Sequence, residues 1–226
     1  MRRPFVTANF AITADGRIAI GGGASGGIGS AADKRRLLEI RAGCDAILAG
    51  ARTVAADNMA MGLPANDLVC ERVRRGKTKY PLRVVVSNSG KLDSKLKVFQ
   101  QTAGQTIVFS TQKMSRRVQE AIVPSAELYL FESTTVNLAI ALSILRDDFG
   151  IQRMVCEGGG TLLKSLLIEN LVDELNITLC PRIFGGKKSP TLTGIIGDFL
   201  PASVRLKLMD MQPVGTECFT RWKIRR

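Results

Sequence analysis

Residues 152–179 read QRMVCEGGGTLLKSLLIENLVDELNITL, and this stretch decides the fold class. It places four patterns in series: a strand-like segment at 152–156, three glycines at 158–160, a helical pattern at 161–170 and a second strand at 174–179. Leu163, Leu167 and Leu171 recur at intervals of four, which gives the predicted helix one apolar face. A strand followed by a crossover helix and another strand is the unit from which parallel sheets are built.

The same alternation of strand and helix extends along the rest of the chain. Further strands are predicted at residues 5–12, 46–49, 82–86, 106–109 and 127–131, and helices at 138–149 and from a cap at Ser30 to about Gly43. Residues 204–211 and 218–224 predict a hairpin around Pro213 and Gly215. Only residues 58–79 are predicted to be a long irregular segment, and no Ser/Gly-rich linker divides the chain. We therefore predict an α/β fold with a mostly parallel central sheet, flanking helices and a C-terminal antiparallel hairpin, in a single domain over residues 1–226.

The charge and hydropathy of the chain limit its partners. It carries 32 basic and 20 acidic residues, and the net charge of +12 attracts phosphorylated small molecules or nucleic acid. Aromatic residues make up 5% and do not interleave with basic clusters such as 72–79. We therefore predict mostly solvated surface charge and no specific nucleic-acid binding. No apolar run approaches the ~20 residues of a membrane span, and no secretory leader is evident, so we expect a cytoplasmic protein without a membrane partner.

The lack of histidine and the wide spacing of the cysteines exclude several kinds of catalytic and metal site. The chain has no histidine, which excludes Ser-His-Asp and Cys-His catalysis. Its five cysteines lack the close spacing of zinc ligands, and their odd number argues against a disulfide framework. We expect reduced, mostly buried thiols and no metal site.

The glycine run is the strongest candidate for ligand binding. Gly158, Gly159 and Gly160 precede the predicted helix, where glycines allow close approach to the backbone and free N–H groups attract phosphate. Glu157 ends the strand and is expected at the same crevice, while a plain tight turn is the simpler alternative for the run. Residues 21–26 also match G-x-G-x-x-G, but the helix does not open at the third glycine and no acid follows at the required distance. We interpret them as a loop that covers a ligand.

A third segment, residues 50–58, reads GARTVAADN and again follows a predicted strand. Thr53 as the cap of a short helix and Asp57 as a surface residue would explain the segment equally well when it is taken alone.

Several segments together resemble one known family. They are residues 6–18 (VTANFAITADGRI), 41–57 with Gly-x-x-Thr-Val, 81–87, 157–161 (EGGGT), 171–174 (LVDE) and 181–186 (PRIFGG). The family is the riboflavin-biosynthesis pyrimidine reductases, which share the dihydrofolate reductase fold, and the resemblance spans almost the whole chain. It implies NADPH-dependent reduction of a ribosylamino-pyrimidine phosphate to its ribitylamino form, by hydride transfer to C1′ of the opened ribose. It also implies a homodimer, which an exposed terminal strand at 204–211 would favour.

The resemblance further implies roles for individual residues. Thr53, Gly158, Gly159 and Gly160 match positions that hold NADPH, and Ser25, Ser87 and Thr161 are assigned to the same cofactor. Asn9, Arg41, Asp57 and Glu157 match substrate positions. Arg41 suits the ribose phosphate through a charge-assisted contact, and Asp57 and Glu157 are the catalytic candidates, with Asp57 preferred for proton transfer.

Two departures from the family pattern leave the substrate open. Bacterial members usually have lysine where Asn9 stands, whereas asparagine resembles the stand-alone archaeal type. Residues 57–62 read DNMAMG, where the family commonly has Asp-Asn/Asp-Pro and an apolar residue. The alternatives are the deaminated or the diamino pyrimidine, a pterin or another heterocycle, and, in other classes, a basic RNA-binding protein or an inactive paralogue.

Overall fold

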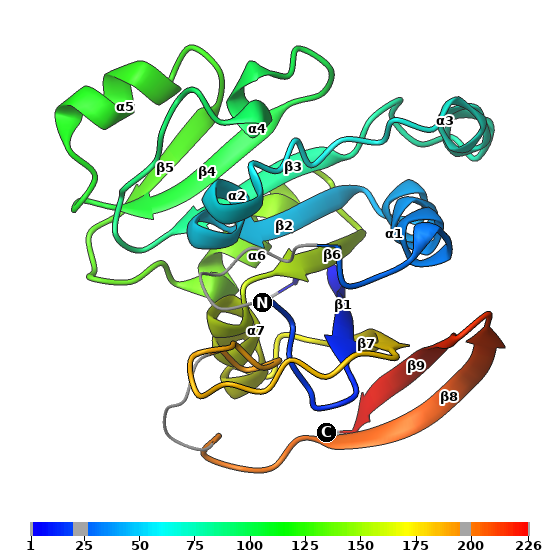
Figure 1. Ribbon diagram of the computed structural model, residues 1–226. Coiled ribbons are helices and arrows are strands. Elements are labelled where there is room, and N and C mark those ends of the chain that lie inside the picture. Colours follow the sequence, from blue (N-terminus) through cyan, green and yellow to red (C-terminus); the bar gives the residue numbers. More distant parts are fainter. Residues whose placement is uncertain (1, 20–26, 195–199, 226) are drawn as a thin grey trace. The chain divides into compact units, whose positions relative to one another are not determined.

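The computed structural model describes residues 2–19, 27–194 and 200–225 (Figure 1). The chain forms two compact units. Unit 1 contains Met1–Pro4 and Leu38–Val155, and unit 2 contains Phe5–Leu37 and Cys156–Arg226. One boundary lies between Pro4 and Phe5, and the other two fall inside helix α1 (Ala31–Gly43) and strand β6 (Arg153–Gly158).

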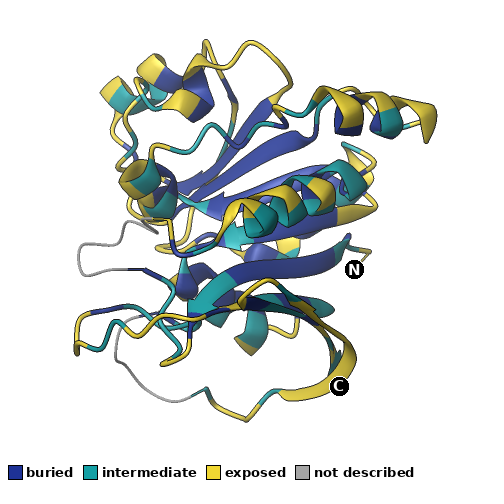
Figure 2. Ribbon diagram, turned by 45° about the vertical axis from the view of Figure 1, so that its right-hand side comes forward, coloured by how far each residue is buried: buried dark blue, intermediate teal, exposed yellow. Residues whose placement is uncertain are grey.

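Unit 1 is built on parallel strands in the order β5-β4-β3-β2. Its strands are β2 (Ala46–Gly50), β3 (Leu82–Ser87), β4 (Thr106–Thr111) and β5 (Glu127–Phe131). Its helices are α2 (Ala51–Asp57), α3 (Asn66–Arg74), α4 (Lys97–Gln100), α5 (Arg116–Ile122) and α6 (Leu138–Asp147). Every residue of β3 and β4 is buried (Figure 2), which explains why these strands are continuous runs of mostly β-branched and apolar residues.

The core of unit 1 packs around Ile47, Val85 and Val108, which come from three neighbouring strands. Helix α6 illustrates how the helical spacing sorts residues: it buries Leu138, Ala141, Leu142 and Leu145 along one stripe. Asn137 caps this helix, and its side-chain oxygen accepts a hydrogen bond from the Ile140 N–H at 3.0 Å.

Unit 2 has the strand order β6-β1-β7-β9-β8. Strand β1 (Phe5–Thr13) is parallel to β7 (Glu174–Cys180), whereas β9 (Glu217–Arg225) is antiparallel to both β7 and β8 (Arg205–Val214). Helix α7 (Gly160–Ile168) follows β6. The edge strand β8, beside the C-terminal label in Figure 2, is exposed along almost its whole length.

The predicted α/β fold is confirmed: parallel strands alternate with helices along the chain, and the last two strands form an antiparallel hairpin. Ser30 caps α1 as predicted, because its Oγ accepts the N–H groups of Ala32 and Asp33 at 3.1 and 3.3 Å. The prediction of an irregular segment over 58–79 is wrong, because α3 lies within it and buries Leu68 and Val69. None of the helices in the described residues is long and apolar enough to cross a membrane.

Candidate functional site

The glycine run lies in unit 2 at the junction of β6 and α7. Gly158 is the last residue of β6, Gly159 has a φ of 76°, and Gly160 begins α7, one residue before the predicted start. The positive φ of Gly159 is a conformation that favours glycine. Gly159, at the N-cap position, has no side chain to cap the first N–H groups of α7, which lie at the positive end of the helix dipole. This end of α7 therefore suits a phosphate.

Gly160 is also required by the packing of unit 2. A Cβ at this position would lie 2.4 Å from the Gly194 nitrogen and 2.6 Å from the Thr191 oxygen. Thr191 and Gly194 are held in place by reciprocal backbone hydrogen bonds of 2.9 Å. The packing of unit 2 is thus sufficient to explain the absence of a side chain at Gly160. Thr161 follows in the first turn of α7 and is exposed.

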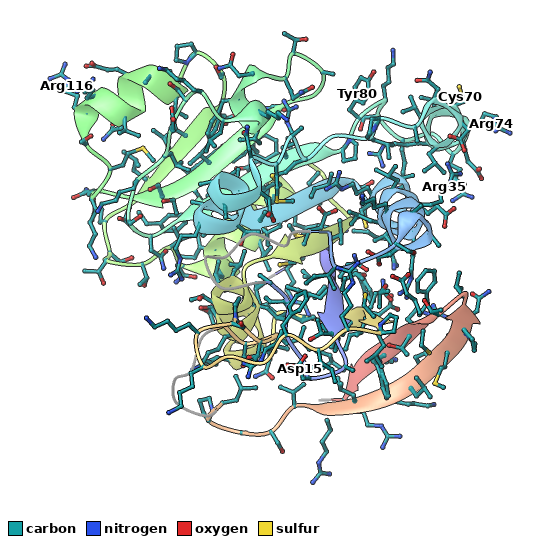
Figure 3. The ribbon with its side chains drawn as sticks, viewed as in Figure 1. Asp15, Arg35, Cys70, Arg74, Tyr80 and Arg116 are labelled. Atoms are coloured by element: carbon teal, nitrogen blue, oxygen red, sulfur yellow. The ribbon has the colours of Figure 1, made fainter. Side chains whose placement is uncertain are left out.

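Asp15, labelled in Figure 3 beside the loop after β1, joins two of the sequence motifs. Its carboxylate accepts the N–H groups of Phe184 and Gly185 at 3.2 and 2.7 Å and the hydroxyl of Thr13 at 2.5 Å. The Thr13 hydroxyl and these backbone donors lower the pKa of Asp15 to about 2. These hydrogen bonds hold the Asp-Gly turn after β1 against the 181–186 segment after β7, so both motifs have a structural role.

Asn9 and Glu157 are the predicted substrate residues in unit 2. Asn9 lies in the middle of β1 and is 9% exposed, and its side-chain oxygen has no hydrogen-bond partner among the described residues. Glu157 is the second-last residue of β6 and is half-buried. A buried amide oxygen without a partner is costly, and a donor on a ligand would remove that cost. Asn176 shares this property, and no sequence motif pointed to it.

Arg41 lies in the last turn of α1, in the part of that helix that belongs to unit 1. Its side chain is buried, and its Nη1 donates a hydrogen bond to the Gly62 carbonyl at 2.6 Å. The C-terminal end of a helix favours a cation, and a guanidinium presents a fork of donors that matches a phosphate.

Thr53 and Asp57 both belong to α2 in unit 1. The helix begins after Gly50, which supplies no side-chain cap, and Thr53 lies inside the first turn, so the interpretation of Thr53 as a cap is wrong. Asp57 is the last residue of α2 and is half-buried. Because four positions separate the two residues, their side chains lie on one face of the helix. Asn58 closes the helix with a φ of 44°, and its side-chain oxygen accepts the Lys97 N–H at 2.9 Å.

Ser87 ends β3, also in unit 1. It is 3% exposed, and its hydroxyl oxygen has no hydrogen-bond partner among the described residues. Its carbonyl accepts the hydroxyl of Ser110 on β4 at 2.7 Å, which fixes the backbone at the carboxyl end of these two strands. Ligands of open parallel sheets bind at this end of the strands.

The predicted residues are thus divided between the two units. Unit 1 holds Arg41, Thr53, Asp57 and Ser87, and unit 2 holds Asn9, Glu157, Gly158, Gly159, Gly160 and Thr161. Ser25 lies outside the described residues. Within the described ranges, no group of three or more cysteine, aspartate or glutamate side chains is arranged to hold a metal ion.

Comparison with known proteins gives a match over nearly the whole chain. The family model described as "RibD C-terminal domain" matches residues 4–220. The chain belongs to the RibD C-terminal domain family. A member from Methanothermobacter thermautotrophicus, named 2,5-diamino-6-ribosylamino-4(3H)-pyrimidinone 5′-phosphate reductase, is 33% identical over 224 residues, which cover 99% of each chain. A protein of the same name from Archaeoglobus fulgidus is 34% identical over 190 residues, which cover 84% of this chain and 86% of the relative.

Similar solved structures confirm the fold. A pyrimidine reductase-like protein from Corynebacterium diphtheriae superposes with a TM-score of 0.87 at 24% identity, covering 99% of this chain and 92% of that one. A bifunctional deaminase/reductase from Thermotoga maritima has a TM-score of 0.78 at 24% identity, covering 98% of this chain and 57% of that one. The predicted dihydrofolate reductase-like fold is therefore correct.

The motifs of this RibD C-terminal domain serve two purposes. Asp15 and Gly160 have structural roles, because their contacts lie within unit 2. Asn9 and Ser87 each keep a buried polar atom without a partner in the described structure, which is typical of residues that contact a ligand.

Proposed function

We propose that this chain is an NADPH-dependent reductase of riboflavin biosynthesis that converts a ribosylamino-pyrimidine phosphate to its ribitylamino form. The observation that carries the proposal is the end-to-end match with an archaeal protein named as a 2,5-diamino-6-ribosylamino-4(3H)-pyrimidinone 5′-phosphate reductase. The same name supports the diamino pyrimidine over the deaminated form, a pterin or another heterocycle. The net charge of +12 suits a phosphorylated substrate and a phosphorylated cofactor.

The residues present fit a nicotinamide dinucleotide phosphate. Gly158 and Gly159 carry no side chains at the start of α7, and the first N–H groups of that helix would bind the pyrophosphate. The unpartnered hydroxyl of Ser87 would accept or donate a hydrogen bond near the 2′-phosphate. Thr53, Gly160, Thr161 and Ser25 complete the proposed cofactor residues. When bound, NADPH supplies the hydride that reduces C1′ of the opened ribose.

The substrate residues would position the sugar phosphate and hold a proton. The buried guanidinium of Arg41 would bind the ribose phosphate through charge-assisted hydrogen bonds. Asn9 would hydrogen-bond the substrate through its unpartnered amide oxygen. Asp57, at the end of α2, would exchange the proton that accompanies reduction, with Glu157 as the second candidate. The chain would then act mainly by orienting two ligands, which needs neither a nucleophile nor a metal ion.

The proposal includes the assembly and location of the enzyme. We propose a single functional domain over residues 1–226 and a homodimer in which the exposed edge strand β8 contacts a second copy. Leu206, Leu208, Met209 and Met211 are 39–59% exposed on this strand, and such apolar side chains favour a covered surface. A cytoplasmic location accords with a phosphorylated substrate.

Steady-state oxidation of NADPH tests the activity. Absorbance at the nicotinamide band should fall only when the ribosylamino-pyrimidine phosphate is added, and kcat/KM should be higher for the diamino than for the deaminated form. Turnover of a pterin in place of both pyrimidines would contradict the proposal. Fluorescence titration with NADPH and with RNA separates a reductase from an RNA-binding protein.

A further inference from the structure

Strand β7 carries a second buried amide beside Asn9. Asn176 is 6% exposed, and its side-chain oxygen has no hydrogen-bond partner among the described residues. Asn9 and Asn176 are register partners in the parallel pair β1–β7. Register partners on adjacent strands project to the same face of a sheet, so the two amides lie side by side on one face of unit 2.

The same face carries a fixed cation from α1. Arg36 donates from Nη1 to the Thr178 hydroxyl at 3.0 Å, and from Nη2 to the Thr220 carbonyl at 2.9 Å. Its guanidinium also lies 4.6 Å from the centre of the Phe219 ring. Since Thr178 is two residues beyond Asn176 on β7, the side chains of both point to the face that Arg36 covers. Arg36 is therefore occupied by the fold, whereas the adjacent amide oxygens of Asn9 and Asn176 are not.

Two adjacent buried acceptors without donors are costly in a folded protein. Leucine has the same branched arrangement of side-chain heavy atoms as asparagine and carries no polar atom that needs a partner, so packing alone does not account for Asn176. The neighbouring Thr220 provides a contrast: its hydroxyl donates to the Ile177 carbonyl and accepts from the Trp222 indole, so it is fully used by the fold.

We propose that Asn176 is a substrate-positioning residue that acts together with Asn9, and that their amide oxygens accept hydrogen bonds from N–H or O–H donors of the substrate. This inference rests on the proposed function, and it adds a residue that no motif of the sequence contains. The donors are either the amino groups of the pyrimidine ring or the hydroxyl groups of the sugar, both of which present N–H or O–H to an acceptor.

The test compares Asn176→Leu with the wild type by steady-state kinetics, NADPH titration and thermal melting. KM for the ribosylamino-pyrimidine phosphate should rise by about 3- to 10-fold, as expected for the loss of one neutral hydrogen bond. The Kd for NADPH should stay within about twofold, and Tm should stay equal or rise because an unpartnered oxygen has been removed. Asn176→Thr, which keeps an acceptor oxygen on a side chain suited to strands, should restore part of the KM.

Two further variants separate the possible outcomes. Thr220→Val, the control, should lower Tm and leave KM unchanged, because only contacts within the fold are lost. If Asn176→Leu behaves like Thr220→Val, or leaves KM unchanged in an active enzyme, the inference is wrong while the proposed function stands. If Asn9→Leu also leaves KM unchanged, the proposed substrate site is wrong as well, and a wild type without turnover overturns both.

The deaminated substrate identifies the donor. A larger rise in KM for the diamino form than for the deaminated form assigns the contact to the ring amino group that only the diamino form carries. An equal rise for both forms assigns it to a donor that the two forms share, which is a sugar hydroxyl or the 5-amino group. Either result supports a direct contact between Asn176 and the substrate.

Discussion

Replacing Gly160 by alanine tests why α7 begins with glycine. The added Cβ would lie 2.4 Å from the Gly194 nitrogen, 2.6 Å from the Thr191 oxygen and 2.8 Å from the Gly194 Cα. All three atoms belong to the backbone and cannot rotate away as a side chain would. The 191–194 turn must therefore move when the methyl group is introduced.

The size of the loss follows from two opposing terms. Forcing an extra methyl group into a packed site costs up to about 3 kcal/mol, and three simultaneous contacts with backbone place Gly160→Ala near that upper value. Alanine is favoured over glycine in a helix by about 1 kcal/mol. The net destabilisation is about 2 kcal/mol, which in a chain of this length lowers Tm by about 4–8 °C.

Thermal melting with a matched control measures this loss. Gly43 ends α1, and a Cβ built there meets no atom within 4 Å, so Gly43→Ala should keep or raise Tm. If Gly160→Ala melts at or above the wild-type temperature, the argument from close packing is refuted. Gly159→Ala should cost about 1 kcal/mol through its positive φ and should also weaken NADPH binding by tenfold or more, if the glycine run binds the pyrophosphate.

Four further outcomes are expected. Arg41→Ala should cost roughly 2–4 kcal/mol of transition-state stabilisation, measured as a higher KM for the phosphorylated substrate but not for NADPH. It should also lower Tm, because the hydrogen bond to the Gly62 carbonyl is lost. A lower Tm with unchanged kinetics would show that Arg41 has only a structural role. Asp57→Asn should lower kcat and leave NADPH affinity intact, and an unchanged kcat would exclude Asp57 from proton transfer. NADPH should be preferred over NADH in kcat/KM, and equal values would remove the 2′-phosphate site. Light scattering at micromolar concentration should give a dimer, whereas a monomer would count against pairing through β8.

Local patterns were sufficient to predict most strands and their order of appearance. Residues 127–131 were predicted as a strand and form β5 with the same bounds, because a short apolar run between turns has few other solutions. Ser30 was predicted as a helix cap and caps α1. Its own N–H, however, donates to Glu217, which lies 187 positions further along the chain. No local pattern contains that partner.

The burial of Arg72 is the clearest difference between the structure and the prediction from the sequence. The prediction of solvated charge for residues 72–79 is wrong for Arg72, which is 1% exposed and donates to the Thr78 carbonyl at 2.6 Å and the Ala42 carbonyl at 3.0 Å. Carbonyls near the end of a helix need donors, and this arginine satisfies one of them from α3. The helix was missed for the same reason, because its buried face contains a cation.

Site residues that belong to a sequence motif could be predicted, whereas residues that are brought together only by strand pairing could not. The glycine run and Arg41 stand out in the sequence because glycine and charge have few roles at such positions. Asn176 becomes notable only when β1 and β7 pair and place it beside Asn9. The division of the chain inside α1 and β6 could not be predicted either, because these two of its three boundaries fall within regular structure.

The most direct test follows the hydrogen atoms of the reaction. The purified protein is incubated with 2,5-diamino-6-ribosylamino-4(3H)-pyrimidinone 5′-phosphate and NADPH that carries deuterium at both C4 positions of the nicotinamide, and the product is analysed by mass spectrometry and NMR. A ribitylamino product that carries one deuterium at C1′ is the predicted result. NADPH oxidation without deuterium in the pyrimidine product, or no product at all, would contradict the assignment of this chain as a reductase of that substrate.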